Sequence, residues 1–213
     1  MEMQTSPVRS PNARAHAHHA ELLNGCTLAD NFPSLDSVEL NGGIVSGAAT
    51  LNRYTGITVD GSSRVSYPAE SFSDFTVVLS FTASSGGVIA TNSNVKNDSA
   101  DPGWSIWVDD DGVHATHGDG TATATECFLE GEFTDSTEHV VTYAVDLSGG
   151  THTLYVDSSS DDSVTTVSGP IASTKRICVG AGYLSDNVTG IIGGIRIYNG
   201  SVLTEDDHSA YAS

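Results

Sequence analysis

The alternation of β-branched and aromatic residues with polar ones limits the possible folds of this chain more than any other feature. It begins near residue 22, and Gly, Asp, Asn or Ser interrupts it about every eight to twelve residues. One such run places four apolar side chains on a single face of a strand, namely Phe75, Val77, Leu79 and Phe81. Roughly ten or more short strands with almost no helix predict an all-β sandwich or jelly roll, not an α/β enzyme fold.

The run Asp109-Asp-Asp-Gly112 predicts a hairpin turn. In the strand before it, Trp104, Ile106 and Val108 share one face, and Trp107 lies on the opposite face. One helix signal is present, close to the C-terminus. Thr204 followed by Asp207 has the spacing of a capping box, which predicts a short helix at the end of the chain.

Five stretches follow one another in a familiar order: Gly56–Pro68, Asp74–Phe81, Gly103–Gly112, Glu138–Tyr143 with Thr153–Asp157, and Thr189–Asn199 with Leu203–Tyr211. In this order they resemble laminin-G-like, concanavalin-A-like jelly rolls, and the last stretch resembles the closing strand and short C-terminal helix of that family. The resemblance implies an all-β, concanavalin-A-like β-sandwich jelly roll of the laminin-G type. It says less about function, because lectins, adhesion modules and glycosidases share this fold.

The first residues differ in kind from the rest of the chain. We expect residues 1–24 to form an extended N-terminal arm and residues 25–213 to form the jelly-roll domain. The whole chain carries a net charge of −19, but Arg9 and Arg14 against Glu2 give the first twenty residues +1, so the remainder carries −20. This asymmetry predicts an arm that docks onto a neighbouring subunit, and hence a homo-oligomer. The alternative is a floppy polar leader, which is common at chain termini.

The acidity of the body constrains its partners and its surroundings. Acidic residues number 27 and basic residues 8, yet only 16% of the chain is charged, so missing bases contribute as much as added acids. This pattern resembles proteins of salt-saturated cytoplasm, where salt screens the repulsion between carboxylates. The alternative is an ordinary soluble acidic protein. In both cases the surface repels backbone phosphates, and we expect no nucleic-acid partner.

The sequence also carries expectations about targeting and thiols. Residues 1–20 are polar and lack the apolar centre of a secretory signal, and no apolar run approaches about 18 residues, so we expect neither export by the general route nor membrane insertion. Cys26, Cys127 and Cys178 are too few and too scattered for a disulfide framework. We expect buried free thiols at the last two, although a single bridge stays open as an alternative.

Catalysis by glycoside hydrolysis would need two carboxylates beside the scissile bond. The nearest candidates are Glu126, Glu130 and Glu132, which alternation places on one face of a strand, but Phe128 stands between the first two. We therefore predict a protein that is not an enzyme.

Calcium is the metal that the resemblance implies, because members of this family often hold it in rim loops. The candidate ligands are Asp98 and Asp101 in one loop and Asp186 in another. The alternative for each is a surface residue that keeps the protein soluble. His16-Ala-His-His19 could bind a transition metal or be a solvated part of the arm. Alternation argues against joint ligation by two further histidines, since it separates His114 from His117.

Glycan recognition would require exposed aromatic rings, because sugars stack their apolar faces on them. The candidates are Trp107, Tyr54 and Tyr183, and the alternative for each ring is packing between the sheets.

Three features together suggest a function: an adhesion-type jelly roll, no export signal and a basic arm. The hypothesis that joins them is a virion surface protein of a tailed virus from a salt-loving archaeon, made in the host cytoplasm. It would be a capsid decoration, a turret component or a tail fibre or spike subunit. The arm would bind other virion proteins, and the jelly roll would contact a host glycan. The alternatives are a cell-encoded carbohydrate-binding or adhesion module and, less favoured, a glycoside hydrolase.

Overall fold

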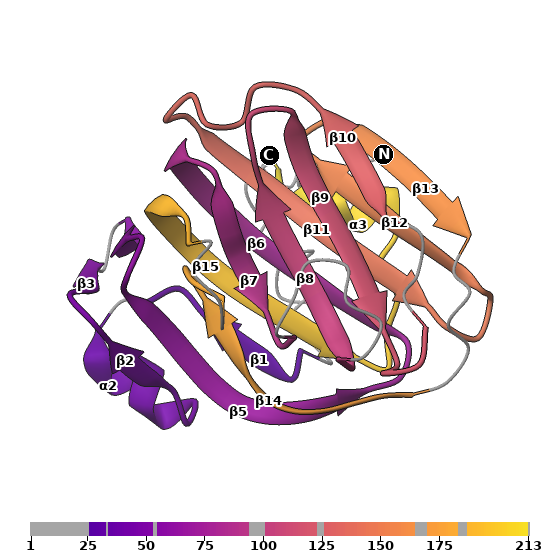
Figure 1. Cartoon of the computed structure of the whole chain (residues 1–213), viewed down its shortest axis with the longest axis horizontal. Helices are drawn as coiled ribbons and strands as arrows, with labels where there is room; N and C mark the ends of the chain where they lie inside the picture. The colour runs from indigo at the N-terminus through magenta and orange to yellow at the C-terminus, as the bar shows by residue number, and fades with distance from the viewer. Residues whose placement is uncertain are drawn as a thin grey trace, which may run out of the picture.

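Two antiparallel β-sheets face each other in the computed structural model, with one helix behind them and a second at one side (Figure 1). The structure describes residues 26–32, 34–52, 55–93, 101–122, 126–164, 170–182 and 187–212, without the side chains of residues 35–37 and 162–164. This arrangement confirms the predicted all-β sandwich. It follows from the alternation in the sequence, because a strand with one apolar face must bury that face against another layer.

We call the rear sheet in Figure 1 sheet A, and its strand order is β13-β12-β11-β6-β15-β4-β3, with β1 also paired to β15. The bounds of its strands are β1 Leu28–Asp30, β3 Thr50–Asn52, β4 Gly56–Asp60, β6 Phe75–Ser85, β11 Glu138–Asp146, β12 Thr151–Val156, β13 Ser159–Val164 and β15 Thr189–Asn199. The hairpin of β11 and β12 and the long pairing of β6 with β15 fix the centre of this sheet.

We call the front sheet sheet B, and its strand order is β10-β9-β8-β7-β14-β5-β2. Its strands are β2 Ile44–Ser46, β5 Arg64–Phe72, β7 Gly87–Thr91, β8 Gly103–Val108, β9 Gly112–Gly118, β10 Cys127–Glu130 and β14 Ile171–Val179. The predicted hairpin turn is present between β8 and β9, where the Asp109 amide donates to the Gly112 carbonyl at 3.0 Å.

The core lies between the two sheets and contains the residues that alternation assigned to it. Val77, Leu79 and Phe81 enter it from sheet A, and Trp104 and Ile106 enter it from sheet B. Burying a side chain of this size stabilises a fold by about 1.5–3 kcal/mol relative to exposure. The same alternation sends the intervening residues of each strand to the outer faces, where binding surfaces can form.

A short helix, α3 (Glu205–Tyr211), ends the described chain and packs on the outer face of sheet A. Thr204 caps it: the Thr204 hydroxyl accepts from the Asp207 amide, and the Asp207 carboxylate accepts from the Thr204 amide. This is the predicted capping box. No helix among the described residues is long and apolar enough to cross a membrane.

The structure adds a helix that the sequence did not predict. Helix α2 (Leu35–Leu40) precedes β2, and its six residues are too few to show a helical period. The three cysteines are not joined by disulfides, and those at positions 127 and 178 are buried, as expected.

At one side of the sandwich the edge strands of the two sheets lie against each other. Strand β10 ends sheet B and β13 ends sheet A, and the two are in contact. The Phe128 amide donates to Asp161 Oδ2 at 2.9 Å across this edge. A side-chain carboxylate thus occupies a backbone donor that an open edge strand would present to solvent.

Candidate functional site

A groove crosses the outer face of sheet A, over strands β11, β6 and β15. The register places Val140, Ser80 and Gly194 side by side across these strands, and Glu138, Thr82 and Ile191 in the next row. Two adjoining hollows of about 240 and 250 Å³ share Ser80, Glu138 and Gly193 in their walls. Even-numbered residues of β6 face outward here because the odd-numbered ones fill the core.

Two consecutive glycines of β15 form the floor of this groove. The register shifts between Ile192 and Gly194, so Gly193 is an extra residue in the strand. A Cβ atom on Gly193 would lie 2.3 Å from Ser80 Oγ, and one on Gly194 would lie 2.7 Å from Asn31 Oδ1. Any larger residue at these positions would therefore fill the space that the groove occupies.

Arg196 and Tyr211 form one end of the groove. The Arg196 guanidinium carbon lies 5.3 Å from the centre of the Tyr211 ring, and Arg196 Nη2 donates to Asn31 Oδ1 at 3.2 Å. The Tyr211 hydroxyl is hydrogen-bonded to the Tyr198 hydroxyl, and burial raises the pKa of both tyrosines. A cation over an aromatic face is attractive, so this end presents a fixed positive charge beside a rigid ring.

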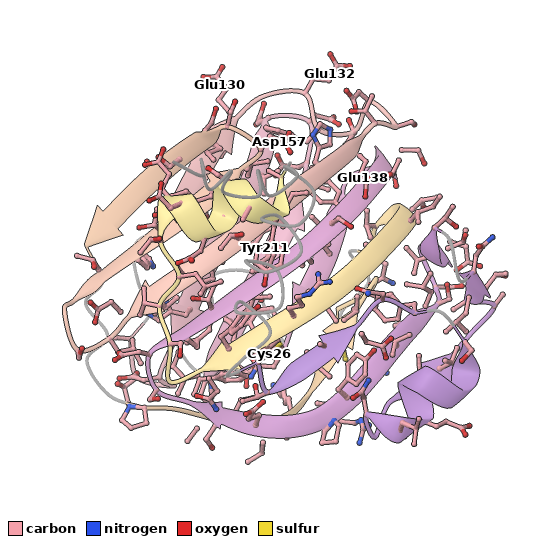
Figure 2. All side chains as sticks on the ribbon, turned by 180° about the vertical axis from the view of Figure 1, so that it is seen from behind. Cys26, Glu130, Glu132, Glu138, Asp157 and Tyr211 are labelled. Carbon is pink, nitrogen blue, oxygen red and sulfur yellow. The ribbon has the colours of Figure 1, made fainter. Side chains whose placement is uncertain are left out.

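Glu138 supplies the carboxylate of the groove. It is the first residue of β11 and is exposed, and Figure 2 shows it on the same face of sheet A as Tyr211. The half-buried hydroxyls of Ser80 and Thr82 lie beside it in the lining. The groove thus offers a carboxylate that only accepts hydrogen bonds, hydroxyls that donate or accept them, and a guanidinium that only donates them. This combination matches a ligand rich in hydroxyl groups.

Helix α3 holds Tyr211 at the groove through a buried histidine. His208 Nε2 donates to the main-chain oxygen of Asp157 at 2.7 Å, so its Nδ1 can accept from the Thr142 hydroxyl, 2.8 Å away. Its ring also stacks on Tyr155. Burial lowers the pKa of His208, and the Asp157 carbonyl partly opposes that effect. A neutral His208 therefore fixes the helix on the sheet.

A second histidine fixes the start of β11 beside Glu138. His139 Nδ1 lies 2.8 Å from Asp157 Oδ2, and its Nε2 lies 3.2 Å from Asp135 Oδ1. Hydrogen bonds from the amide and hydroxyl of Thr137, with a smaller contribution from His139, lower the pKa of Asp135 to about 2. The carboxylates of Asp135 and Asp157 thus bind the same His139 ring, and these contacts anchor the strand that carries Glu138.

The predicted ring Trp107 lies on the outer face of sheet B, as alternation required, but it is only 3% exposed. Its ring stacks on His114 with a centroid distance of 5.0 Å, and His114 stacks in turn on Phe128 at 4.5 Å. Trp107 is therefore the buried end of a three-ring stack. His117 points the other way into the core, which confirms that alternation separates the two histidines.

The other predicted site residues are distributed as follows. Tyr54, Tyr183, Asp98 and Asp186 lie outside the described residues, and so does the His16–His19 tract. Asp101 forms an ion pair with Lys175. Within the described ranges, no group of three or more His, Cys, Asp or Glu side chains is arranged to hold a metal ion. Calcium at Asp98, Asp101 and Asp186 stays a prediction.

The three candidate catalytic carboxylates stand in different local settings. Glu126 Oε1 lies 2.5 Å from His114 Nδ1, which accounts for its position. Glu130 is exposed at the end of β10, and Glu132 follows in the next turn; Figure 2 shows both at the rim of the sandwich.

No protein-family model and no curated protein sequence matches the chain. Solved structures do resemble it. Domain 4 of the GH43 extracellular arabinanase AbnA of Geobacillus stearothermophilus, in complex with arabinotriose, matches with a TM-score of 0.60 and 15% identity over 80% of this chain and 88% of that domain. The CBM40 domain of the Ruminococcus gnavus IT-sialidase matches with a TM-score of 0.51 and 14% identity. The match covers 67% of this chain and 84% of that domain.

A third similar structure is the binding domain of Paraclostridial Mosquitocidal Protein 1, with a TM-score of 0.69 and 14% identity over 90% of this chain. This chain spans about half of that domain, 52% of its length. The three structures define the class of fold: a two-sheet jelly roll of the kind found in carbohydrate-binding domains. At these identities the likeness concerns the fold, and the residues of the groove must carry any argument about function.

Proposed function

We propose that this protein is a glycan-binding module without catalytic activity, and that the groove on the outer face of sheet A holds the sugar. The observation that carries the proposal is the lining itself. Glu138, Ser80, Thr82 and Arg196 offer acceptors and donors along the two adjoining hollows, with Tyr211 as a side wall of one of them. Ligand sites combine a few placed polar groups with an apolar or aromatic wall.

Two similar structures support this proposal through their ligands. The AbnA domain was solved with arabinotriose, and the CBM40 domain was also solved with α2,3-sialyllactose. The Paraclostridial Mosquitocidal Protein 1 structure is a binding domain, which favours recognition over hydrolysis.

The proposal is tested by replacing the carboxylate of the groove. We expect Glu138→Gln to weaken the binding of a glycan identified on an array by about tenfold or more, because hydrogen bonds to charged groups contribute about 1.5–3 kcal/mol. Glu132→Gln is the matched control, since it removes the same charge outside the groove. An array on which the wild-type protein binds no glycan would overturn the proposal.

We further propose that the module works as part of a virion, as a capsid decoration, turret component or tail fibre or spike subunit. The charge distribution supports this. The first twenty residues carry a net charge of +1 and would attach to the particle, and the remaining residues carry −20 and would stay hydrated. An array of such modules on one particle would multiply a weak affinity through effective concentration.

Deleting residues 1–24 tests this second proposal. We expect the truncated protein to bind glycan as before and to lose its incorporation into particles. Incorporation at the wild-type level would contradict the proposed attachment. A cell-encoded adhesion module is the alternative, and neighbouring reading frames without capsid or tail proteins would favour it.

A further inference from the structure

Three aromatic rings stack on the outer face of sheet B, on the opposite side of the sandwich from the groove. Trp107, His114 and Phe128 lie directly opposite one another across β8, β9 and β10. Their rings stack with interplanar angles of 4° and 26°. The exposed fraction rises along the stack from 3% at Trp107 to 37% at Phe128. Phe128 is therefore the solvent-facing end of the stack.

Two carboxylates hold the middle ring in place. His114 Nε2 lies 2.9 Å from Asp109 Oδ1, and His114 Nδ1 lies 2.5 Å from Glu126 Oε1. Both ring nitrogens of His114 therefore have a carboxylate oxygen within hydrogen-bond distance, one on each side of the ring. Burial alone would raise the pKa of Asp109, but hydrogen bonds from His114 and from the turn amides lower it overall.

The Phe128 ring packs over Gly112, which has no side chain. A Cβ atom on Gly112 would lie 2.6 Å from Phe128 Cε2, so the ring occupies the space where another residue would carry its side chain. The Phe128 amide is also held by Asp161. With its backbone bonded and one ring face on His114, Phe128 loses little conformational freedom when a ligand binds, which favours affinity.

The surroundings of Phe128 indicate which ligand could bind there. Glu130 ends β10 two residues after Phe128, and Glu126 directly precedes the strand. Residues two apart on a strand lie about 7 Å apart, which is the scale of one sugar ring. The carboxylates of Glu126, Glu130 and Asp161 would repel an anionic sugar and accept hydrogen bonds from hydroxyls.

We propose that Phe128 is the stacking platform of a second sugar site that takes a neutral pyranose or furanose ring of a glycan. The apolar face of the sugar lies on the Phe128 ring, and its hydroxyls donate to Glu130. This site rests on the proposed glycan-binding function but lies on the opposite sheet from the groove. One domain would then hold two points of a glycan chain or two chains.

The test is a set of single variants measured by calorimetry with lactose and with 3′-sialyllactose, which differ in the anionic sugar. We expect Phe128→Ala to weaken lactose binding at one site by about tenfold and Phe128→Trp to retain it, in line with the contribution of aromatic stacking. Val202→Ala is the matched control, because Val202 is 40% exposed and belongs to neither surface. Circular dichroism of each variant establishes that the sheets are intact.

The outcomes separate this site from the groove. Loss of binding in Glu138→Gln with no change in Phe128→Ala would overturn the second site and leave the groove standing. Loss in Phe128→Ala alone would support the platform and overturn the groove. Loss in Phe128→Trp equal to that in Phe128→Ala would also overturn the platform, because a larger ring should still stack. No binding of either sugar by the wild-type protein would count against both.

Discussion

His117 and His152 face each other in the core, with their Nδ1 atoms 3.2 Å apart. The Tyr143 hydroxyl lies 2.7 Å from the first and 2.8 Å from the second. Tyrosine has one hydroxyl hydrogen, so it donates to one ring and accepts from the other. Burial, with the neighbouring His152 contributing further, lowers the pKa of His117 to about 3.

This pair predicts a loss of stability in mild acid. The unfolded chain binds a proton at His117 below about pH 6.5, and the folded chain does so only near pH 3, so the stabilisation is complete above 6.5 and is lost as the pH falls towards 3. The slope is about 1.4 kcal/mol per pH unit. Urea unfolding at pH 6.5 and 5.0 should show a loss of about 2 kcal/mol from this group.

His117→Gln provides the comparison. We expect this variant to be less stable at pH 7 by about 1–3 kcal/mol, because the hydrogen bonding of Tyr143 is disturbed. Its stability should nevertheless fall less steeply between pH 6.5 and 5.0. An unchanged slope would show that His117 is not the group responsible.

The close approach of Gly193 to Ser80 predicts that a side chain at position 193 will clash, and that shortening Ser80 will relieve the clash. We expect Gly193→Ala to lower stability by about 1–3 kcal/mol and to weaken glycan binding, because its Cβ would approach Ser80 Oγ to 2.3 Å. Adding Ser80→Ala removes that oxygen and should restore most of the stability. Gly182→Ala is the control, since its Cβ would make only an ordinary 3.4 Å contact. Thermal unfolding of the four proteins measures the effect.

The capping box of α3 predicts a link between helix stability and the groove. Thr204→Ala should cost about 1 kcal/mol, because it removes the hydroxyl that accepts from the Asp207 amide. Since α3 carries Tyr211, glycan affinity should fall as well. Ser209→Ala changes an exposed residue of the same helix and should leave both quantities nearly unchanged. Equal losses in the two variants would contradict a role for the cap.

The carboxylates at the rim predict that salt stabilises the protein. Glu130 and Glu132 lie at the upper rim in Figure 2, and Asp157 and Glu138 lie below them in that view. The screening length shortens from about 10 Å at 0.1 M salt to about 3 Å at 1 M, so the Tm should rise over this range. The double variant Glu130→Gln, Glu132→Gln should show a smaller rise. A Tm that falls with added salt would mean that attractive pairs outweigh the repulsion.

Local sequence pattern predicted the core but could not predict which outer faces are exposed. Alternation assigned Val77 and Trp104 to the core and Trp107 to the opposite face, and all three assignments are confirmed. It could not show that Trp107 is buried there, because its cover comes from His114 on another strand. The candidate platform Trp107 is therefore buried. Within the three-ring stack, Phe128 is the ring that reaches solvent.

The groove escaped sequence reasoning for a similar reason. Ser80, Glu138 and Arg196 stand on three strands, and only the pairing register brings them together. One signal was available: two adjacent glycines, Gly193 and Gly194, inside a strand indicate a bulge or a close approach of another group. Helix α2 was missed because six residues give no measurable period.

The contact between Phe128 and Asp161 has a consequence for assembly. A sandwich whose two sides can both add strands can grow into a filament, whereas one with a single available side stops at a two-fold pair. In this chain β10 and β13 are engaged with each other, and β2 and β3 end the sheets at the other side. Within the described part of the chain, the side that carries β10 and β13 is therefore less open to strand addition than the side that carries β2 and β3.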